Sequence, residues 1–173
     1  MPLSLHIGTP RPAFGQEYGD LSKMRATFMA ASDHWVRISL GDLILNGVFE
    51  RYPTLQVGSV EHELSWVAFF LWKIDYVYTQ RAQRPFWHRF QEDMLPSDYF
   101  HRNVFVGFQE EATGIRLRDI IGVDNLQWGS DYPHPESTFP KSREILGGIL
   151  SDCTDAEKAK IVGANAARVY RLG

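Results

Sequence analysis

Side chains that can bind metal ions or move protons follow each of four apolar segments along the sequence. These side chains are His6, then Glu61 and His62, then Gln109 and Glu110, and finally Asp131 and His134. Imidazole nitrogens and carboxylate oxygens are the ligands that Zn²⁺ and related divalent ions accept. A histidine beside such an ion can also transfer a proton, because its intrinsic pKa lies close to neutrality. The residue types therefore predict a metal site with a group for acid or base chemistry next to it.

Each of these residues also has a purely structural explanation. A histidine at the end of a strand, such as His6, can be a satisfied structural residue, and residues 61–63 can begin a solvated loop. Asp131 stands before Tyr-Pro, where an aspartate favours the start of a turn. The combination of imidazole and carboxylate groups at successive segment ends is what favours a site. The remaining histidines follow no apolar segment, and we expect structural roles for them: His34, His88 and His101.

The apolar patterns predict the elements that must position these groups. We predict strands at residues 3–7, 54–60, 103–109 and 124–129. We predict helices at residues 22–52, with a break near 32–33, and at 64–78, 113–121, 141–150 and 154–171. Residues 80–99 are expected to form a loop with one short helix. Thr154 and Asp155 are the expected N-cap and first-turn acid of the last helix.

Strand and helix alternate four times, which indicates parallel strands joined by right-handed crossovers in an α/β sheet or barrel. In such a fold the C-terminal ends of all strands lie on one side, and ligands bind there. The metal-binding and proton-transferring candidates should therefore gather on a single face of the protein.

Length and composition narrow the class of protein. The chain has 173 residues, of which 44% are hydrophobic, so it can bury one core. A net charge of -3 gives no electrostatic signature of nucleic-acid binding. The longest apolar run, residues 66–72, is too short to cross a membrane, and residues 1–8 lack a signal-peptide pattern. With Cys153 as the single cysteine, we expect a cytoplasmic protein without an intramolecular disulfide.

Four motifs in order resemble one known family. They are GVFERYP at residues 47–53, VGSVEH at 57–62 followed by Trp66, WGSDYPH at 128–134, and GANAARVYRL at 163–172. This set is similar to the decarboxylase-like branch of the amidohydrolase superfamily, related to aminocarboxymuconate-semialdehyde decarboxylase. The resemblance implies a (β/α)₈ TIM barrel with one divalent metal ion, Zn²⁺ or Mn²⁺, at the C-terminal ends of the strands. It also implies a small-molecule substrate, for which a carboxylate or aromatic acid is the expected class.

The resemblance assigns roles to five residues of this chain. His6 matches the family's metal-binding histidine of the fifth strand, and Asp131 matches the aspartate of the eighth, which serves the metal and the chemistry. His62 matches a catalytic histidine of the sixth strand. Trp66 and His134 fall where the family's substrate pocket is lined.

The sequence departs from the family in one respect. It contains no His-x-His or Glu-x-His pair, which the family places at the end of its first strand, and it has four predicted strands where a barrel closes with eight. We therefore expect residues 1–173 to be a partial TIM-barrel domain, the C-terminal half, incomplete as an enzyme without an N-terminal half. The alternative arrangement is a homo-oligomer in which two copies of this chain close one eight-stranded ring.

Three functions stay open at this point. The first is a metal-dependent hydrolase or a non-oxidative decarboxylase, because both chemistries use the same ligands. The second is a non-catalytic binding or oligomerisation module derived from the same fold. The third is an unrelated open α/β domain of the flavodoxin type, which the sequence disfavours because no glycine-rich phosphate loop follows the first strand.

Overall fold

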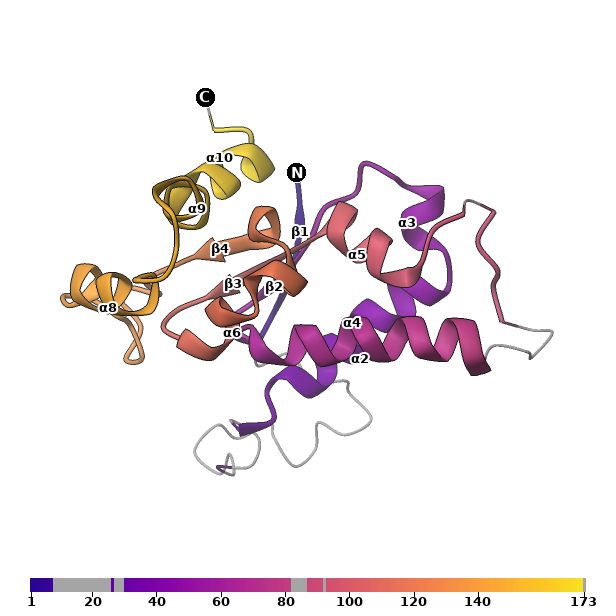
Figure 1. Ribbon diagram of the computed structural model, residues 1–173, viewed down its shortest axis with the longest axis horizontal. Helices are drawn as coiled ribbons and strands as arrows, with labels where there is room; N and C mark the ends of the chain where they lie inside the picture. Colours follow the sequence, from indigo (N-terminus) through magenta and orange to yellow (C-terminus); the bar gives the residue numbers. More distant parts are fainter. Residues whose placement is uncertain (8–25, 27–29, 82–86, 92, 173) are drawn as a thin grey trace.

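The computed structural model describes residues 1–7, 26, 30–81, 87–91 and 93–172, and it contains one sheet of four strands. The strands are β1 (Leu3–His6), β2 (Val57–Val60), β3 (Val104–Phe108) and β4 (Leu126–Trp128). They lie side by side in chain order, and all three pairings are parallel (Figure 1). This confirms the predicted α/β architecture with four βα units, half the number of a closed barrel.

Helices connect and follow the strands. Between β1 and β2 lie α2 (Asp33–Leu45) and α3 (Val48–Arg51). Between β2 and β3 lie α4 (Ser65–Tyr76), the π-helical turn η3 (Val77–Arg81) and α5 (Pro96–Asn103). The segment before β4 forms α6 (Ala112–Arg116), α7 (Arg118–Ile121) and the 3₁₀ turn η4 (Val123–Asn125). After β4 come α8 (Ser142–Ile149), α9 (Asp155–Ala159), the π-helical turn η5 (Lys160–Ala164) and α10 (Asn165–Tyr170).

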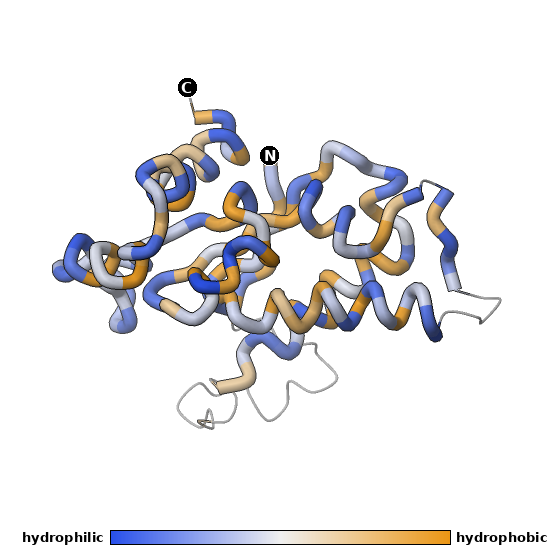
Figure 2. The backbone as a smooth tube through the Cα atoms, in the orientation of Figure 1, coloured by the Kyte–Doolittle hydropathy of each residue, from blue (hydrophilic) through white to orange (hydrophobic). Residues whose placement is uncertain are grey.

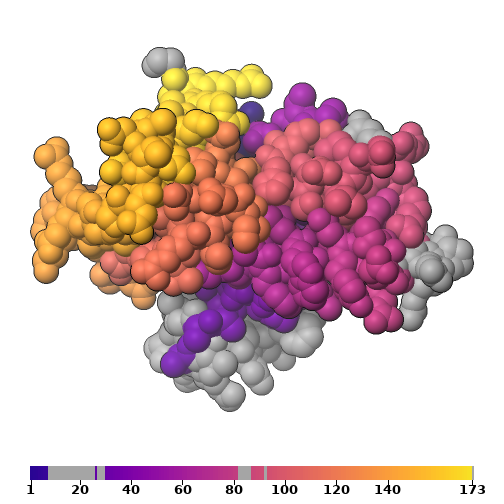
Figure 3. All heavy atoms as spheres, viewed as in Figure 1, coloured from indigo at the N-terminus to yellow at the C-terminus, as the bar shows by residue number. Residues whose placement is uncertain are grey.

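The two faces of the sheet have different surroundings, because side chains alternate along each strand. Val57, Val106 and Leu126 are fully buried and belong to a core shared with helix residues such as Leu40 and Val67. Hydrophobic segments run along the strands and through α4 (Figure 2). In the space-filling view, α8 to α10 occupy one end of the molecule and α4 and α5 the other (Figure 3). The opposite face of the sheet carries residues that line a pocket.

Three asparagines join β2, β3 and β4 to the units that follow them. The side-chain amide of each donates to two backbone carbonyls near the N-terminal end of a strand: Asn103 to Pro53 and Leu55, Asn125 to His101 and Val104, and Asn165 to Val123 and Leu126. The distances run from 2.7 to 3.0 Å, and all three residues are buried. Carbonyls that a sheet edge or loop would leave unpaired are satisfied in this way.

Several predicted boundaries differ from the structure. The predicted helix at 22–52 lies partly outside the described residues; α2 begins at the predicted break, and Gly47, with φ of 67°, separates it from α3. The predicted helix at 113–121 divides into α6 and α7 at Leu117, whose backbone is not helical. The helix predicted at 64–78 continues to Arg81 through a π-helical turn.

The motif at residues 47–53 has a structural role. Phe49 is fully buried in the core. The carboxylate of Glu50 contacts His88 Nε2 at 2.9 Å and accepts a bond from the backbone N–H of Gln91. These contacts attach residues 88–91 to α3, so His88 has the structural role predicted for it. Over the described part of the chain, no helix is long and apolar enough to cross a membrane.

Candidate active site

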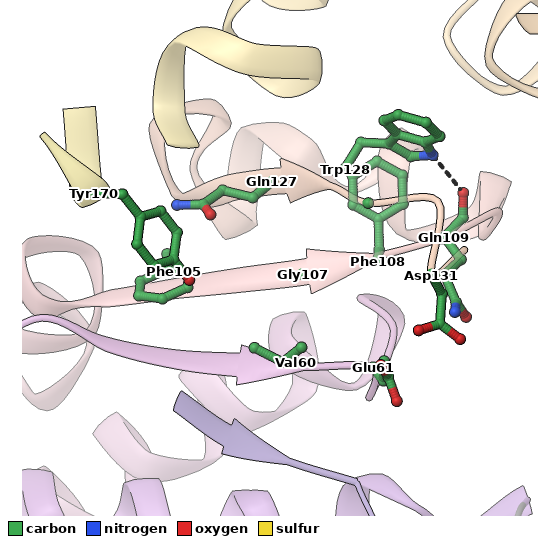
Figure 4. Close-up of a pocket in the computed structure, with 11 residues that line it drawn as sticks. Val60, Glu61, Phe105, Gly107, Phe108, Gln109, Gln127, Trp128, Asp131 and Tyr170 are labelled. Atoms are coloured by element: carbon green, nitrogen blue, oxygen red, sulfur yellow. Dashed lines mark hydrogen bonds between the residues drawn. The ribbon is translucent and has the colours of Figure 1, made fainter. Parts of the chain in front are cut away.

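Three side chains from three strand ends meet at one place on the sheet. His6 Nε2, at the end of β1, lies 3.0 Å from Oε1 of Glu61, which directly follows β2. The carboxyl group of Glu61 in turn lies near that of Asp131, which follows β4, closely enough for Asp131 to raise the pKa of Glu61. Figure 4 shows Glu61 and Asp131 at the same end of the sheet, beyond the tips of their strands. The predicted gathering of His6 and Asp131 is thus present in the structure, with Glu61 between them.

The imidazole of His6 is oriented by a second contact. Its Nδ1 lies 2.8 Å from the backbone carbonyl of Ile7, so Nδ1–H donates there and Nε2 is turned toward Glu61. Histidines that bind metals are commonly held by such a bond from the other ring nitrogen. The side chain is 52% exposed, so its environment is the open rim of the sheet rather than the core.

Glu61, and not the following residue His62, faces the pocket at the end of β2. Strand alternation places residue 62 on the same face as Val60, which lines the pocket. Glu61 has a φ of 64°, however, and this left-handed backbone reverses the alternation. Glu61 therefore faces the pocket, and His62 turns back toward the strand. A left-handed conformation costs a residue with a side chain about 1–2 kcal/mol, and Glu63 adopts one as well, with φ of 55°.

His62 is buried away from the cluster. Only 6% of it is exposed, and its Nδ1 lies 3.1 Å from the hydroxyl of Ser59. Burial, the main cause, and the nearby charge of His6, the second, together lower the pKa of His62 to about 4. The structure therefore holds His62 as a neutral imidazole under the pocket rim and does not bring it to Asp131. Its predicted catalytic role stays a prediction.

The two residues predicted to line a substrate pocket make contacts beside it. Trp66 donates from its indole Nε1 to the carbonyl of Glu63 at 3.0 Å and packs against the core. His134 Nδ1 lies 3.1 Å from Oδ2 of Asp131, and its side chain is 60% exposed. His134 thus extends the cluster outward, whereas Trp66 supports the turn that carries Glu61.

A pocket of about 240 Å³ lies on the open face of the sheet, below the carboxyl cluster. Eleven residues line it: Val60, Glu61, Phe105, Gly107, Phe108, Gln109, Gln127, Trp128, Gly129, Asp131 and Tyr170. Four of the lining residues are aromatic, and the carboxyl groups of Glu61 and Asp131 mark one end of the pocket (Figure 4). Most small-molecule sites combine apolar walls with a few polar groups in this manner.

Gln127 is the polar residue deepest in this pocket. It is 7% exposed, and its Nε2 is buried without a hydrogen-bond partner among the described residues. A buried donor without a partner is costly, so this amide favours an acceptor arriving in the pocket. The sequence offered one signal for it, because the alternation along β4 places residues 127, 129 and 131 on the pocket face.

The carboxyl groups at this rim are shifted toward protonation. Burial is the largest cause of the raised pKa of Glu61, followed by the neighbouring carboxyl group of Asp131, while His6 opposes the shift. Burial also raises the pKa of Glu63 to about 7. Like charges on neighbouring carboxyl groups repel, which is one reason why the proximity of Asp131 raises the pKa of Glu61.

A divalent ion suits part of this donor set. An imidazole and two carboxyl groups are hard or borderline ligands of the kind that a divalent cation accepts. Within the described ranges, however, no three His, Cys, Asp or Glu side chains are grouped so that they could hold a metal ion. The described residues therefore provide a partial site, and a complete coordination sphere needs further ligands.

Comparisons with known proteins agree with this geometry. The profile of the Amidohydrolase family matches residues 3–172. The fold is similar to that of 5-carboxyvanillate decarboxylase from Sphingomonas paucimobilis, with a TM-score of 0.78 at 22% identity, over 100% of this chain and 50% of that one. It is also similar to 2,6-dihydroxybenzoate decarboxylase from Rhizobium, with a TM-score of 0.70 at 21% identity, over 99% and 51%.

A third solved structure adds information about a metal. A dihydroxybenzoic acid decarboxylase from a Polaromonas species, crystallised with manganese and the inhibitor 2-nitroresorcinol, gives a TM-score of 0.72 at 20% identity. The match covers 99% of this chain and 50% of that one. The chain thus spans about half the length of the solved proteins it resembles.

Proposed function

Because the chain belongs to the amidohydrolase family, we propose that it provides half of a metal-dependent active site for a small carboxylic acid. The observation that carries this proposal is the meeting of His6, Glu61 and Asp131 at the mouth of an aromatic pocket. In the proposal, His6 and Asp131 are ligands of one divalent ion, Mn²⁺ or Zn²⁺. The other half of the site would come from an N-terminal half-barrel carrying the pair of ligands that this chain lacks.

Such an ion acts as a Lewis acid toward a bound carboxylate or carbonyl oxygen. The residues of this chain would do the rest. Phe105 and Tyr170, whose rings contact each other at the pocket, would hold an aromatic ring, and the amide of Gln127 would donate to a polar substituent on it. Glu61, whose pKa is raised by burial and by the neighbouring Asp131, would supply a proton at the pocket mouth, where a reacting carbon would need one.

We favour non-oxidative decarboxylation of an aromatic acid over hydrolysis. In that reaction the bond between ring carbon and carboxyl carbon breaks, CO₂ leaves, and the ring carbon keeps the electron pair and takes a proton. The aromatic residues in the lining and the raised pKa of Glu61 support this assignment, and three similar folds are named as decarboxylases. Hydrolysis would use the same ligands and stays the alternative within the family.

A non-catalytic binding or oligomerisation module is the second candidate function. One observation favours it, namely that the described residues provide no complete group of metal ligands. Under this hypothesis, His6 and Asp131 hold the strand ends together through Glu61 and bind no ion.

Metal binding and turnover separate these functions. Mn²⁺ binding is measured on the purified wild-type chain by titration followed by electron paramagnetic resonance. The same titration is carried out on the site variants His6→Ala and Asp131→Asn. The matched controls, His101→Ala and Asp124→Asn, lie away from the site. The enzyme hypothesis predicts binding, tighter after addition of the first four βα units of a relative, and lost in the two site variants alone. CO₂ release from hydroxybenzoates in the mixture tests decarboxylation. No Mn²⁺ binding with or without the added half would support the non-catalytic module.

A further inference from the structure

Glu111 makes an unusual number of contacts for a carboxylate outside the pocket. Its Oε2 accepts hydrogen bonds from the backbone N–H groups of Leu64 at 2.6 Å and Ser65 at 2.9 Å. Its Oε1 accepts from the hydroxyl of Ser65 and from the backbone N–H of Gly114 at 3.1 Å. One side chain from the end of β3 thereby satisfies the first turns of two helices, α4 and its own α6.

These contacts end on the turn that carries Glu61. Residues 61–64 connect β2 to α4, and both Glu61 and Glu63 have left-handed backbones there. Strained residues of this kind persist only where the surrounding structure fixes them. Glu111 fixes the last residue of the turn by bonding Leu64 and Ser65, and the Trp66 indole fixes the carbonyl of Glu63.

Close packing between α6 and the start of α4 also restricts the position of Glu111. A Cβ atom on Gly114 would lie 2.1 Å from Cβ of Leu64, so only glycine permits this approach of α6 to the start of α4. Leu64 itself is fully buried. The ends of β2 and β3 are therefore joined by a close backbone contact and by the Glu111 carboxylate together.

We propose that Glu111 is a positioning residue: by holding the 61–64 turn in its left-handed form, it keeps Glu61 directed at His6 and Asp131. This rests on the proposed function, in which those three residues form the site. Without the carboxylate, the turn loses the bonds that oppose its strain and relaxes toward ordinary strand geometry. Glu61 then leaves the cluster, although Glu111 itself never touches it.

The test uses the full chain and compares Glu111→Ala with Glu157→Ala. Glu157 is the matched control, because it too caps a helix, accepting from Thr154 N–H at 2.7 Å, and it pairs with Arg118 away from the site. Amide hydrogen exchange and histidine side-chain ¹⁵N shifts are recorded at one pH, below the unfolding temperature of every variant. In Glu111→Ala, exchange at Leu64 and Ser65 should accelerate about tenfold or more, and the His6 signal should move. Glu157→Ala should lower the melting temperature and leave both readouts unchanged.

Glu111→Gln provides the rescue, because its one amide oxygen retains part of the acceptor capacity. It should restore the His6 signal in part. Should Glu111→Ala fail to fold, the same readouts on Glu111→Gln and on Ser65→Ala decide the question. An unmoved His6 signal in folded Glu111 variants, or an equal shift in Glu157→Ala, would overturn the proposal.

These readouts do not depend on a metal or on catalysis. If the wild-type chain binds no Mn²⁺ in either form of the binding experiment, the proposed function fails while the positioning role of Glu111 is still judged by exchange and histidine shifts. If the wild-type chain binds Mn²⁺ and the His6 signal is the same in wild type and in the Glu111 variants, the positioning role is contradicted while the proposed function stands.

Discussion

His6 Nε2 lies 3.0 Å from Glu61 Oε1, so the ends of β1 and β2 share a polar contact that Asp131 extends to β4. Glu61→Gln keeps the shape of this cluster and removes one negative charge. We expect the affinity for Mn²⁺ to fall by about tenfold, the lower end of the effect of groups that support metal ligands. Titration calorimetry measures it, with the exposed Glu110→Gln as control. Equal affinities in wild type and Glu61→Gln would remove Glu61 from the proposed site.

The buried imidazole of His62 makes the protein sensitive to acid. Its pKa is about 4 in the folded state and near 6.5 when unfolded, so between these values the unfolded chain binds more protons. The stability associated with neutral His62 is complete above pH 6.5 and is lost as pH falls toward 4. Urea midpoints across this range should fall more steeply for wild type than for His62→Gln. A variant with an unchanged slope would contradict this burial effect.

Glu63 should have the opposite dependence. Burial raises its folded pKa to about 7, so the folded state binds more protons than the unfolded one between pH 4.5 and 7. Stability from this group is therefore present below pH 4.5 and lost as pH rises to 7. Glu63→Gln should raise the melting temperature at pH 8 by about 2–4 °C and change it little at pH 4.5.

Glu157 is the control for the Glu63 experiment, because the pKa of Glu157 is lowered from the usual glutamate value, whereas that of Glu63 is raised. Its hydrogen bonds with Arg118 and Thr154 lower its pKa to about 2. Glu157→Gln should lower the melting temperature at pH 8, where Glu63→Gln raises it. If both variants shifted the melting temperature in the same direction, the effect of burial on Glu63 would not account for its result.

Asn165 should contribute strongly to stability. Its amide donates to the carbonyls of Val123 and Leu126, both at 2.8 Å, and the residue is 2% exposed. Asn165→Ala leaves two carbonyls without their partner and should cost about 1–3 kcal/mol of unfolding free energy. Asn46→Ala is the matched control, because Asn46 also donates to a carbonyl, that of Asp42, but at an exposed position. Chemical denaturation of both variants checks the difference.

The sequence was sufficient for the sheet and for two members of the cluster. Apolar segments separated by helical patterns predicted four parallel strands, and the structure has them within a few residues of the expected bounds. His6 and Asp131 come together because parallel strands end on the same side, which is a property of the topology and not of any one residue. The helix cap at Thr154 was also predictable, because Glu157 three residues later completes a capping box.

The choice between Glu61 and His62 could not be read from the sequence. Both are polar and adjacent, and regular alternation favours the histidine. The left-handed backbone at Glu61 decides otherwise, and it depends on tertiary contacts from Glu111, 46 and 47 residues away in sequence from the groups it bonds. The unpartnered amide of Gln127 could not be predicted from the sequence either, because the lack of a hydrogen-bond partner among the described residues depends on what surrounds it in the fold.

The three asparagines that bond strand starts have a consequence for how such a protein can change. They lie at the ends of the strands opposite the cluster of His6, Glu61 and Asp131, so the bonds that join the units and the candidate reacting groups occupy opposite ends of the sheet. Substitutions around the pocket can then alter what is bound there without loosening one unit from the next. We therefore expect that changes in the loops at the C-terminal ends of the strands alone can alter ligand specificity, while the three asparagines and their hydrogen bonds stay unchanged.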